Sequence, residues 1–379
     1  MRKILFIAGS RGEYGYIRPI IQEIKKRSDI DYDVLATNMH LLPKFGKSID
    51  EFAKDGIKVS SEIYNTLDGY NHLTMPKSLG ILLLQLPETL SRIAPDIVLI
   101  SGDRGEQLMA AIAAIHMNIP VAHVQAGELS GNVDGVVRHA ITKLSHIHFA
   151  SNEDAKNRVL SLGEQEFRVF QTGAPLIDEL LDDTFPTPKI REKYGISTEA
   201  PLFLIVNHPV TEEQNQAADQ MNKLLSVMRD FNGEKVIICP NSDAGSLATR
   251  RALHQQRDES IHMFFNLPRN DYVGFLKDCD IMVGNSSSGI MEAPTFSKPV
   301  VNIGRRQKNR VAAQNVIHVE DYRENMIKRA IKLGLSEEFK QKIAGTINPY
   351  GTSSASERIT DILSEIPIND MLLNKKMTY

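Results

Sequence analysis

Short apolar runs alternate with longer amphipathic stretches along almost the whole of the 379-residue chain. The runs have the length of buried strands, and the longer stretches have the period of helices that cover a sheet. In the first half, strands are predicted at residues 3–8, 32–37, 96–101, 121–124, 148–150 and 168–172. Helices are predicted at 17–26, 78–93 and 154–162, with others ending at 116 and starting near 135. This alternation is typical of a parallel sheet covered on both faces.

The pattern breaks at residues 182–189, DDTFPTPK, where acidic residues and prolines indicate a linker. Alternation then restarts, with strands predicted at 202–206, 235–239, 281–283 and 299–303 and helices at 211–229 and 354–366. We therefore predict an α/β fold with two Rossmann-like domains, residues 1–180 and 190–353, that face each other across a cleft. Residues 354–379 are predicted to form a C-terminal helix and tail that pack back toward the N-terminal domain, with a frayed end.

Composition narrows the function classes. With 42% hydrophobic and 24% charged residues, the chain has the composition of a globular protein with large cores. Its net charge of −3 argues against a broad cationic surface for nucleic acid. No apolar stretch reaches 18 residues, which argues against a membrane span, and the opening MRKILFIAGS reads as a first strand rather than a signal peptide. Cys239 and Cys279 are expected to be buried thiols, as in a cytoplasmic protein.

Polar and charged residues gather directly after the apolar run at 121–124. Gln125, Glu128, Asp134, Arg138 and His139 lie in a turn-rich segment and at the start of the helix that follows it. In open α/β sheets, ligands bind at the carboxyl ends of the strands, so these side chains are candidate acids, bases and charges for catalysis. The alternative is a solvated loop in which the acidic residues only favour the start of a helix.

Two other strand ends carry groups that can exchange protons. Asp103 and Arg104 follow a strand in the segment SGDRGE, and Asp103 is a candidate acid or base, or only the cap of the next helix. His208 follows a strand and precedes a proline that restricts the backbone. It is a candidate general acid or a cation for phosphates, the alternative being a histidine that only stabilises a turn.

Three segments favour an anion. GSRGEYG, residues 9–15, is predicted to be a turn in which Arg11, together with the amino end of the helix that follows, would favour an anion. The segment differs from the dinucleotide fingerprint, which disfavours a nicotinamide enzyme. GNSSSG, residues 284–289, offers hydroxyls and backbone N–H groups for a diphosphate without a metal, and Glu292 is placed to accept from ribose. GRRQKNR, residues 304–310, is strongly basic. The alternatives are ordinary turns and a solvated loop.

Metal binding is not predicted. His123, His146 and His148 lie among apolar residues, and structural hydrogen bonds explain them better than a metal site. The chain has neither an H-E-x-x-H nor a C-x-x-C pattern. We therefore predict no metal and no redox cofactor.

These segments together resemble the hydrolysing UDP-N-acetylglucosamine 2-epimerases of the sialic acid pathway. The resemblance covers roughly residues 1–365, and its motifs at 127–146 and 284–294 are specific. The matching segments, in order, are GSRGEYG, TNMH, SGDRGE, GELSGNVDGVVRHAITKLSH, NHPVT, PNSDAG, GNSSSGIMEAP and GRRQKNR. The resemblance implies a GT-B-like fold, no cofactor, a UDP-sugar as the partner rather than nucleic acid or membrane, and a homodimer or homotetramer.

The resemblance also implies roles for individual residues. Asp103 and Asp134 match catalytic carboxylates, and His208 matches a histidine near the phosphates and the sugar. Contacts to UDP and sugar are implied for Arg11, His40, Arg104, Gln125, Arg138, Asn241, Gly284, Ser286, Ser287, Ser288, Glu292 and Arg306. Many family members have a catalytic Glu where this chain has Gln125, and an amide cannot transfer a proton at neutral pH. Either Glu128 takes that role, or the remaining carboxylates suffice.

The implied reaction converts UDP-N-acetylglucosamine and water to N-acetylmannosamine and UDP, by elimination of UDP and addition of water, for nonulosonic acid biosynthesis. The nearest alternative is the same reaction on UDP-2,4-diacetamido-2,4,6-trideoxyglucose, in the legionaminic acid pathway. Further alternatives are a non-hydrolysing epimerase, a GT-B glycosyltransferase and a nucleotide-sugar-binding protein without catalysis. The S-G-N-x-D and R-H-A-I-T-K motifs favour the hydrolysing type.

Overall fold

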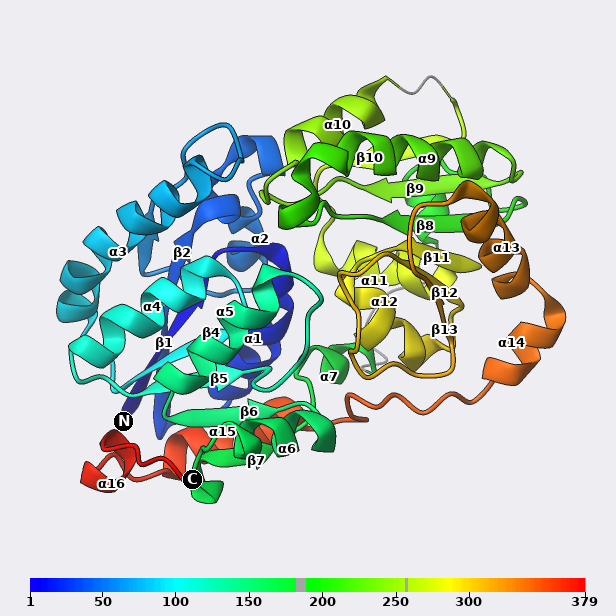
Figure 1. Ribbon diagram of the computed structural model, residues 1–379. Helices are drawn as coiled ribbons and strands as arrows, with labels where there is room; N and C mark the ends of the chain where they lie inside the picture. Colours follow the sequence, from blue (N-terminus) through cyan, green and yellow to red (C-terminus); the bar gives the residue numbers. More distant parts are fainter. Residues whose placement is uncertain (182–188, 256–257, 379) are drawn as a thin grey trace.

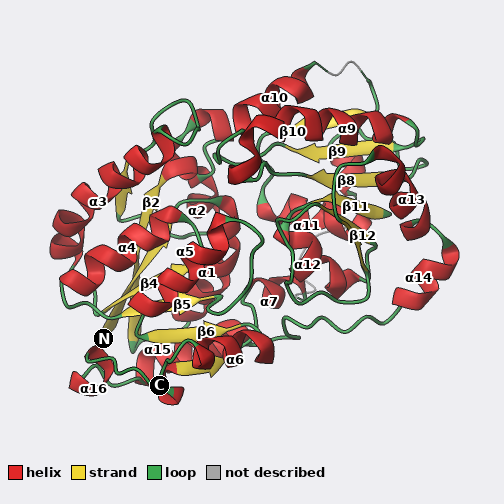
Figure 2. Cartoon of the chain, viewed as in Figure 1, coloured by secondary structure: helices red, strands yellow, loops and turns green. Residues whose placement is uncertain are grey.

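The computed structural model describes residues 1–181, 189–255 and 258–378 (Figure 1). The described chain contains two parallel sheets, each with helices on both faces (Figure 2). The first has the strand order β3-β2-β1-β4-β5-β6-β7, and the second has the order β10-β9-β8-β11-β12-β13. Each sheet thus has a point where the strand order reverses, which is the doubly wound arrangement. The prediction of two Rossmann-like units is confirmed.

The N-terminal lobe is built on the first sheet. Its strands are β1 Arg2–Ala8, β2 Ile30–Thr37, β3 Ser61–Ile63, β4 Ile97–Ser101, β5 Val121–Val124, β6 Ile147–Ala150 and β7 Val169–Gln171. Its helices are α1 Arg11–Ile24, α2 Ile49–Lys54, α3 Thr74–Ile93, α4 Gly105–His116, α5 Val133–Leu144, α6 Glu153–Ser161 and α7 Leu176–Leu180. Strands β1, β4, β5 and β6 are almost entirely buried because helices cover both of their faces.

The C-terminal lobe is built on the second sheet. Its strands are β8 Leu202–Val206, β9 Glu234–Ile238, β10 Ile261–Phe264, β11 Ile281–Gly284, β12 Val300–Ile303 and β13 Val316–Val319. Its helices are α8 Ile190–Lys193, α9 Ala217–Arg229, α10 Ser246–His254, α11 Arg269–Asp278, α12 Ser287–Met291, α13 Glu324–Gly334 and α14 Glu337–Ile343. The chain then returns to the N-terminal lobe in α15 Ala355–Glu365 and α16 Asp370–Leu373, and α15 packs on α1 and α7 (Figure 1).

The described part of the tail packs on the N-terminal lobe at Met371 and Lys375, which differs from the expected frayed tail. Arg168 donates a hydrogen bond to the backbone carbonyl of Met371 at 2.6 Å. The Lys375 ammonium donates to the carbonyl of Lys143 at 2.8 Å, at the end of α5, and forms an ion pair with Glu164 at 2.7 Å. The last carbonyls of a helix need a partner when they are covered, and Lys375 supplies one.

The first turn of α1 also differs from the expectation. The segment GSRGEYG is predicted as a turn, but the helix begins at Arg11. Ser10 caps it through a capping box, in which the Ser10 hydroxyl accepts from the Glu13 N–H and the Glu13 carboxylate accepts from the Ser10 N–H. These paired bonds satisfy the free N–H groups of the first turn and outweigh the weak helix propensity of the glycines.

Other expectations have mixed outcomes. Cys239 and Cys279 are free and buried, as predicted. No helix in the described part of the chain is both long and apolar enough to cross a membrane. The predicted linker at 182–189 lies outside the described residues except for its last residue.

The end of β11 requires a glycine. Gly284 has φ of 138°, and a Cβ there would lie 2.2 Å from the Val206 carbonyl oxygen on β8. Gly284→Ala is therefore expected to lower the free energy of unfolding by at least about 3 kcal/mol, because of backbone strain and this clash. Urea denaturation of both proteins measures the difference in the free energy of unfolding. Gly195 has φ of 68° with open space around it, so Gly195→Ala should cost only about 1–2 kcal/mol. Equal losses would contradict this role for Gly284.

Candidate active site

A cavity of about 230 Å³ lies between the two lobes. Several of the residues that line it lie just after strands of both sheets. In the N-terminal lobe they include Asp103, after β4, and Gln125, after β5; in the C-terminal lobe they include His208, after β8, and Arg306, after β12. The carboxyl ends of the two parallel sheets therefore open onto the same space, which is where α/β folds bind their ligands.

Asp103 is held as an ion at the N-terminal side of the cavity. Its carboxylate pairs with Arg138 and accepts a hydrogen bond from the Ser130 hydroxyl at 3.1 Å. Burial alone would raise the pKa of Asp103, but the charges of Arg138, Arg310 and Arg306 outweigh burial and lower it below its usual value. The carboxylate is thus ionised at neutral pH and can accept a proton.

Asp134 is in the opposite state. It lies in the first turn of α5, where the Asn132 amide donates to it at 2.8 Å. Burial, followed by the negative charges of Asp103 and Asp243, raises the pKa of Asp134 to about 7, against the opposing charge of Arg306. Asp134 is therefore about half protonated near pH 7 and increasingly protonated below it. Two carboxyl groups with pKa values pushed apart are the usual arrangement for an acid and a base in one site.

Gln125 forms part of the cavity wall. Its backbone is in the left-handed region, with φ of 66°, and its carbonyl accepts from Arg138 at 3.1 Å. Its side-chain amide donates to the Tyr16 hydroxyl at 2.6 Å and to the Met291 sulfur at 3.2 Å. The amide is thus committed to two hydrogen bonds within the protein and supplies no proton for chemistry.

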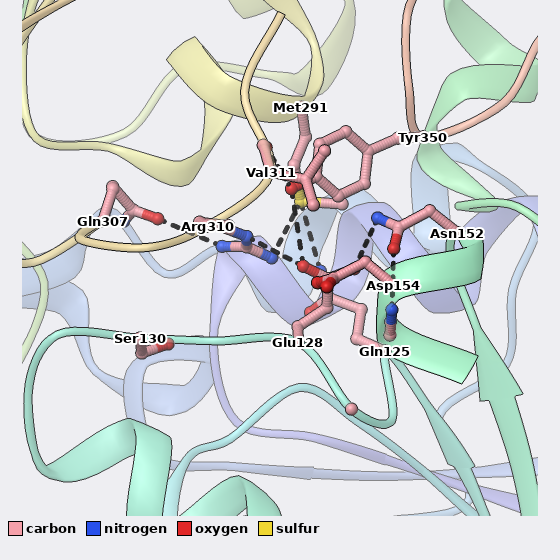
Figure 3. A network of polar contacts seen from close by, with 12 residues as sticks. Gln125, Glu128, Ser130, Asn152, Asp154, Met291, Gln307, Arg310, Val311 and Tyr350 are labelled. Carbon is pink, nitrogen blue, oxygen red and sulfur yellow. Dashed lines mark hydrogen bonds and ion pairs between the residues drawn. The ribbon is translucent and has the colours of Figure 1, made fainter. Parts of the chain in front are cut away.

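Glu128 differs from its expected catalytic role. Glu128 is not among the described residues that line the cavity, although it lies only three positions after Gln125 in the sequence. One carboxylate oxygen accepts from the Asn152 amide at 3.2 Å, and the other accepts from the Arg310 Nε at 3.2 Å (Figure 3). The loop after β5 turns Glu128 away from the cavity toward these partners. The structure therefore does not place Glu128 where it could replace the missing family Glu.

The C-terminal side of the cavity presents hydroxyl groups. Ser286, Ser287 and Ser288 line it, as the sequence predicts, at the start of α12. Ser286 caps the helix by accepting from the Ser288 N–H at 3.3 Å. Glu292 also lines the cavity, with its carboxylate bound by the Arg269 guanidinium at 2.8 Å. Gly284 was expected to contact the ligand, but it is absent from the cavity lining. Its role is instead to let the end of β11 lie close to the backbone of β8.

The two histidines of the cavity are neutral. Burial, followed by the charge of Arg306, lowers the pKa of His208 well below its usual value, and the Asn285 side chain fixes its backbone. Burial lowers the pKa of His40 to about 3, and its Nδ1 lies 2.8 Å from the Ser48 hydroxyl. A neutral imidazole donates or accepts hydrogen bonds but carries no charge. His208, which was expected to be a general acid or a cation, is thus a neutral hydrogen-bonding group.

Arginines supply the positive charge. Arg11, Arg104, Arg138, Arg306 and Arg310 all line the cavity. Arg104 pairs with Asp243 at 3.0 Å, and Arg310 pairs with Glu128 at 3.2 Å. Arg306 donates to the Asn285 carbonyl at 3.2 Å but forms no ion pair with a described residue, and its buried Nε has no hydrogen-bond partner there. Arg306 is therefore a cation available to a ligand. Of the basic run at 304–310, only Arg306 and Arg310 line the cavity among the cations.

Most of the predicted site thus converges on one space. The structure brings together Arg11, His40, Asp103, Arg104, Gln125, Asp134, Arg138, His208, Asn241, Ser286, Ser287, Ser288, Glu292 and Arg306. Sequence reasoning missed further lining residues, and the polar ones among them include Glu13, Tyr16, Ser130, Asn132, Arg269 and Tyr272. Ser130 and Asn132 belong to the S-G-N motif, so a signal was present. The other four lie on helices, and periodicity does not show which helix faces the cavity.

His123, His146 and His148 lie outside the cavity and have hydrogen bonds, as expected of structural residues. His123 Nε2 lies 2.8 Å from the Gly102 carbonyl oxygen, and His148 Nε2 lies 3.1 Å from the Glu164 carboxylate. His146 accepts from the Val121 N–H at 3.1 Å. Each ring thus has a hydrogen-bond partner, whereas the buried second nitrogen of His148, Nδ1, has none among the described residues.

Comparison with known proteins shows the family of the chain. The sequence model of the UDP-N-acetylglucosamine 2-epimerase family matches residues 22–364. The chain is 37% identical to the UDP-N,N'-diacetylbacillosamine 2-epimerase (hydrolyzing) of Legionella pneumophila, over 100% of both chains. It is 31% identical to the UDP-N-acetylglucosamine 2-epimerase of Neisseria meningitidis serogroup B, over 96% of this chain and 95% of that one.

A solved structure shows the same fold. The UDP-GlcNAc 2-epimerase from Neisseria meningitidis bound to UDP-GlcNAc superimposes with a TM-score of 0.81 at 23% identity, over 95% of this chain and 99% of that one. The likeness confirms the GT-B-like arrangement of two lobes. With a family match that spans most of its length and relatives above 30% identity, the chain belongs to the UDP-N-acetylglucosamine 2-epimerase family.

Proposed function

We propose that the chain is a hydrolysing 2-epimerase that takes a UDP-2-acetamido sugar, inverts C2, and releases the free sugar and UDP. The observation that carries this proposal is the pair Asp103 and Asp134, whose pKa values are shifted in opposite directions within one cavity. Family resemblance adds a cytoplasmic homodimer or homotetramer in nonulosonic acid biosynthesis. The proposed reaction requires no cofactor.

The first step is an elimination. The C1–O bond breaks, its electron pair leaves with the β-phosphate of UDP, and the ionised Asp103 takes the C2 proton, which leaves a C1=C2 double bond. A C2 hydrogen is a weak acid, so departure of the diphosphate must lead. Arg306 and the hydroxyls of Ser286 and Ser287 are placed to stabilise the charge that develops on the leaving group.

The second step is a hydration. The oxygen of water bonds to C1, and protonated Asp134 gives its proton to C2 on the face opposite to Asp103. The proton that water loses restores Asp134, and Asp103 returns its proton to solvent. The products are the C2-inverted free sugar and UDP, and one water is consumed. Residues of both lobes line the cavity and limit the access of other water molecules during this step.

The names of the relatives point to two substrates. The relative from Legionella pneumophila, at 37% identity, acts by name on UDP-N,N'-diacetylbacillosamine, which is UDP-2,4-diacetamido-2,4,6-trideoxyglucose. The relative from Neisseria meningitidis, at 31%, is named for UDP-N-acetylglucosamine. The higher identity supports the diacetamido sugar as the first candidate. Initial rates of UDP release from both sugars, measured side by side, test this choice, and a clear preference for UDP-N-acetylglucosamine would reverse it.

Arg306 offers a test of the nucleotide side. Arg306→Ala is expected to raise the Kd for UDP about 10- to 100-fold, because a charge-assisted hydrogen bond to phosphate is lost. Isothermal titration calorimetry measures the change. The matched control is Lys308→Ala, two positions along in the same basic run but exposed, which should change the Kd less than about 2-fold. Equal effects of the two substitutions would remove Arg306 from the proposed diphosphate site.

A further inference from the structure

Glu128 joins the two lobes. It lies in the loop between β5 and α5 of the N-terminal lobe, and its partner Arg310 lies in the loop between β12 and β13 of the C-terminal lobe. The side chains of both residues are almost fully buried, with 2% and 3% exposure. The Tyr350 hydroxyl, on the segment that returns to the N-terminal lobe, lies 3.4 Å from the same carboxylate and donates to the Val311 carbonyl at 2.7 Å (Figure 3).

Arg310 extends this contact to the cavity wall. Its guanidinium donates to the Gln307 side-chain oxygen at 3.1 Å and to the Met291 sulfur at 3.2 Å. The same sulfur accepts from the amide of Gln125 at 3.2 Å and from the Tyr16 hydroxyl at 3.1 Å, both in the N-terminal lobe. Glu128 thus fixes a guanidinium that lines the cavity, without itself reaching the cavity.

The same two loops meet at a second point. The Gly131 N–H donates to the Arg306 carbonyl at 2.9 Å, and the Arg305 side chain donates to the Gly131 carbonyl at 2.7 Å. A Cβ on Gly131 would lie 1.7 Å from the Arg305 carbonyl oxygen, so only glycine allows this approach. We call the two contacts, Glu128–Arg310 and Gly131–Arg305/Arg306, the interlobe joint.

The joined loops carry groups of both halves of the proposed site. The N-terminal loop carries Ser130, which donates to Asp103, and leads directly into Asp134. The C-terminal loop carries Arg306, the available cation for the diphosphate. A buried ion pair gains little net stability because both charges lose their hydration. Its position between the two loops instead fits a role in holding them in register.

We propose that Glu128 is a positioning residue: by holding Arg310 across the interlobe joint, it couples UDP bound on the C-terminal lobe to the alignment of Asp103 and Asp134 on the N-terminal lobe. The proposal rests on the proposed function for the identity of the nucleotide. It assigns Glu128 no proton transfer, and it explains why a carboxylate so close to Gln125 in the sequence lies outside the cavity.

Kinetics of Glu128→Gln test the coupling. This change keeps the shape and removes the charge that holds Arg310. We expect kcat to fall about 10- to 100-fold, the cost of a small misplacement of reacting groups, while the Kd for UDP changes less than about 3-fold. With Asp103 and Asp134 misaligned, addition of water to the intermediate should also be slower. Part of the C1=C2 unsaturated sugar should then leave the enzyme before it is hydrated and appear free in solution. Proton NMR of its vinyl hydrogen measures that fraction.

The matched control is Glu164→Gln. Glu164 is equally buried and ion-paired, but its partners Lys143 and Lys375 pack on the N-terminal lobe alone. Glu164→Gln should lower the Tm and leave the unsaturated-sugar fraction unchanged. The proposal is overturned if Glu128→Gln gives the same fraction and kcat as Glu164→Gln. It is also overturned if Glu128→Gln abolishes elimination in single-turnover experiments, because Glu128 would then act chemically.

Amide hydrogen exchange decides the point without a substrate. In the wild type, UDP should slow exchange in residues 284–292 and also in 128–138; in Glu128→Gln, only 284–292 should respond. Retained protection of 128–138 in the variant overturns the proposal. If UDP protects nothing in the wild type, the proposed function fails instead. The interlobe joint is then tested in the protein without UDP. There, Glu128→Gln should speed exchange in both 128–131 and 305–310, and Glu164→Gln should speed exchange in neither segment. Unchanged exchange of both segments in Glu128→Gln overturns the proposal.

Discussion

Asp103→Asn is expected to reduce turnover at least about 100-fold, the usual effect of removing a general base. Asp103 is the carboxylate that Arg138 and its neighbours keep ionised, and it is the group we expect to remove the C2 proton. An amide of the same shape cannot accept that proton. UDP affinity should change little, because the groups proposed to hold the diphosphate lie on the other lobe.

Steady-state rates of sugar release, together with calorimetric titration by UDP, check this prediction. A suitable control is Asp178→Asn, whose carboxylate accepts from the backbone N–H groups of Ala355 and Ser356 outside the cavity. This control should affect stability and leave kcat near the wild-type value. Wild-type turnover in Asp103→Asn would remove Asp103 from the mechanism. A similar loss of turnover in Asp178→Asn would show that both substitutions act by disturbing the fold.

Asp134→Asn is expected to reduce turnover by a similar factor, at least about 100-fold, and to change the pH profile. The pKa of Asp134 is raised to about 7, so its proton is present below that pH and is lost as the pH rises through it. The wild-type rate should therefore fall on the alkaline side with an apparent pKa near 7. The residual rate of the variant should lack this alkaline limb.

Stability gives an independent check on Asp134. Its pKa is raised from the unfolded value, so ionisation opposes folding once the pH exceeds that unfolded value, and the opposition is complete above about 7. Asp134→Asn removes the buried charge and should raise the Tm of the ligand-free protein at pH 8. A lower Tm at pH 8, or an alkaline limb that persists in the variant, would contradict the assignment of Asp134 as the acid.

The repeating pattern of the chain was sufficient to predict the fold class, and local chemistry explains where it failed. Apolar runs of four or more residues marked β1, β4, β5 and β8, and the three-residue run Ile281–Val283 marked β11. The pattern does not predict β3, which has three residues, or β10, whose residues are only half-buried and at the edge of the second sheet. At α1, the pairing of Ser10 with Glu13 is a capping signal that the glycines obscured.

Strand ends were the informative positions for the site. Asp103, Gln125 and His208 each follow a strand and line the cavity, because parallel strands deliver their carboxyl ends to one edge. Position in a loop was less informative. Glu128 and Ser130 lie two residues apart, yet Ser130 faces Asp103 while Glu128 faces Arg310 of the other lobe. Such partners are separated by 182 positions, and no local pattern predicts them.

The central claim is elimination followed by hydration at C2, and proton NMR in deuterated water tests it most directly. The enzyme is incubated with UDP-2,4-diacetamido-2,4,6-trideoxyglucose and, separately, with UDP-N-acetylglucosamine. The account predicts UDP together with a free, C2-inverted sugar that carries deuterium at C2. Retention of hydrogen at C2, an inverted sugar still attached to UDP, or no turnover of either sugar would contradict it.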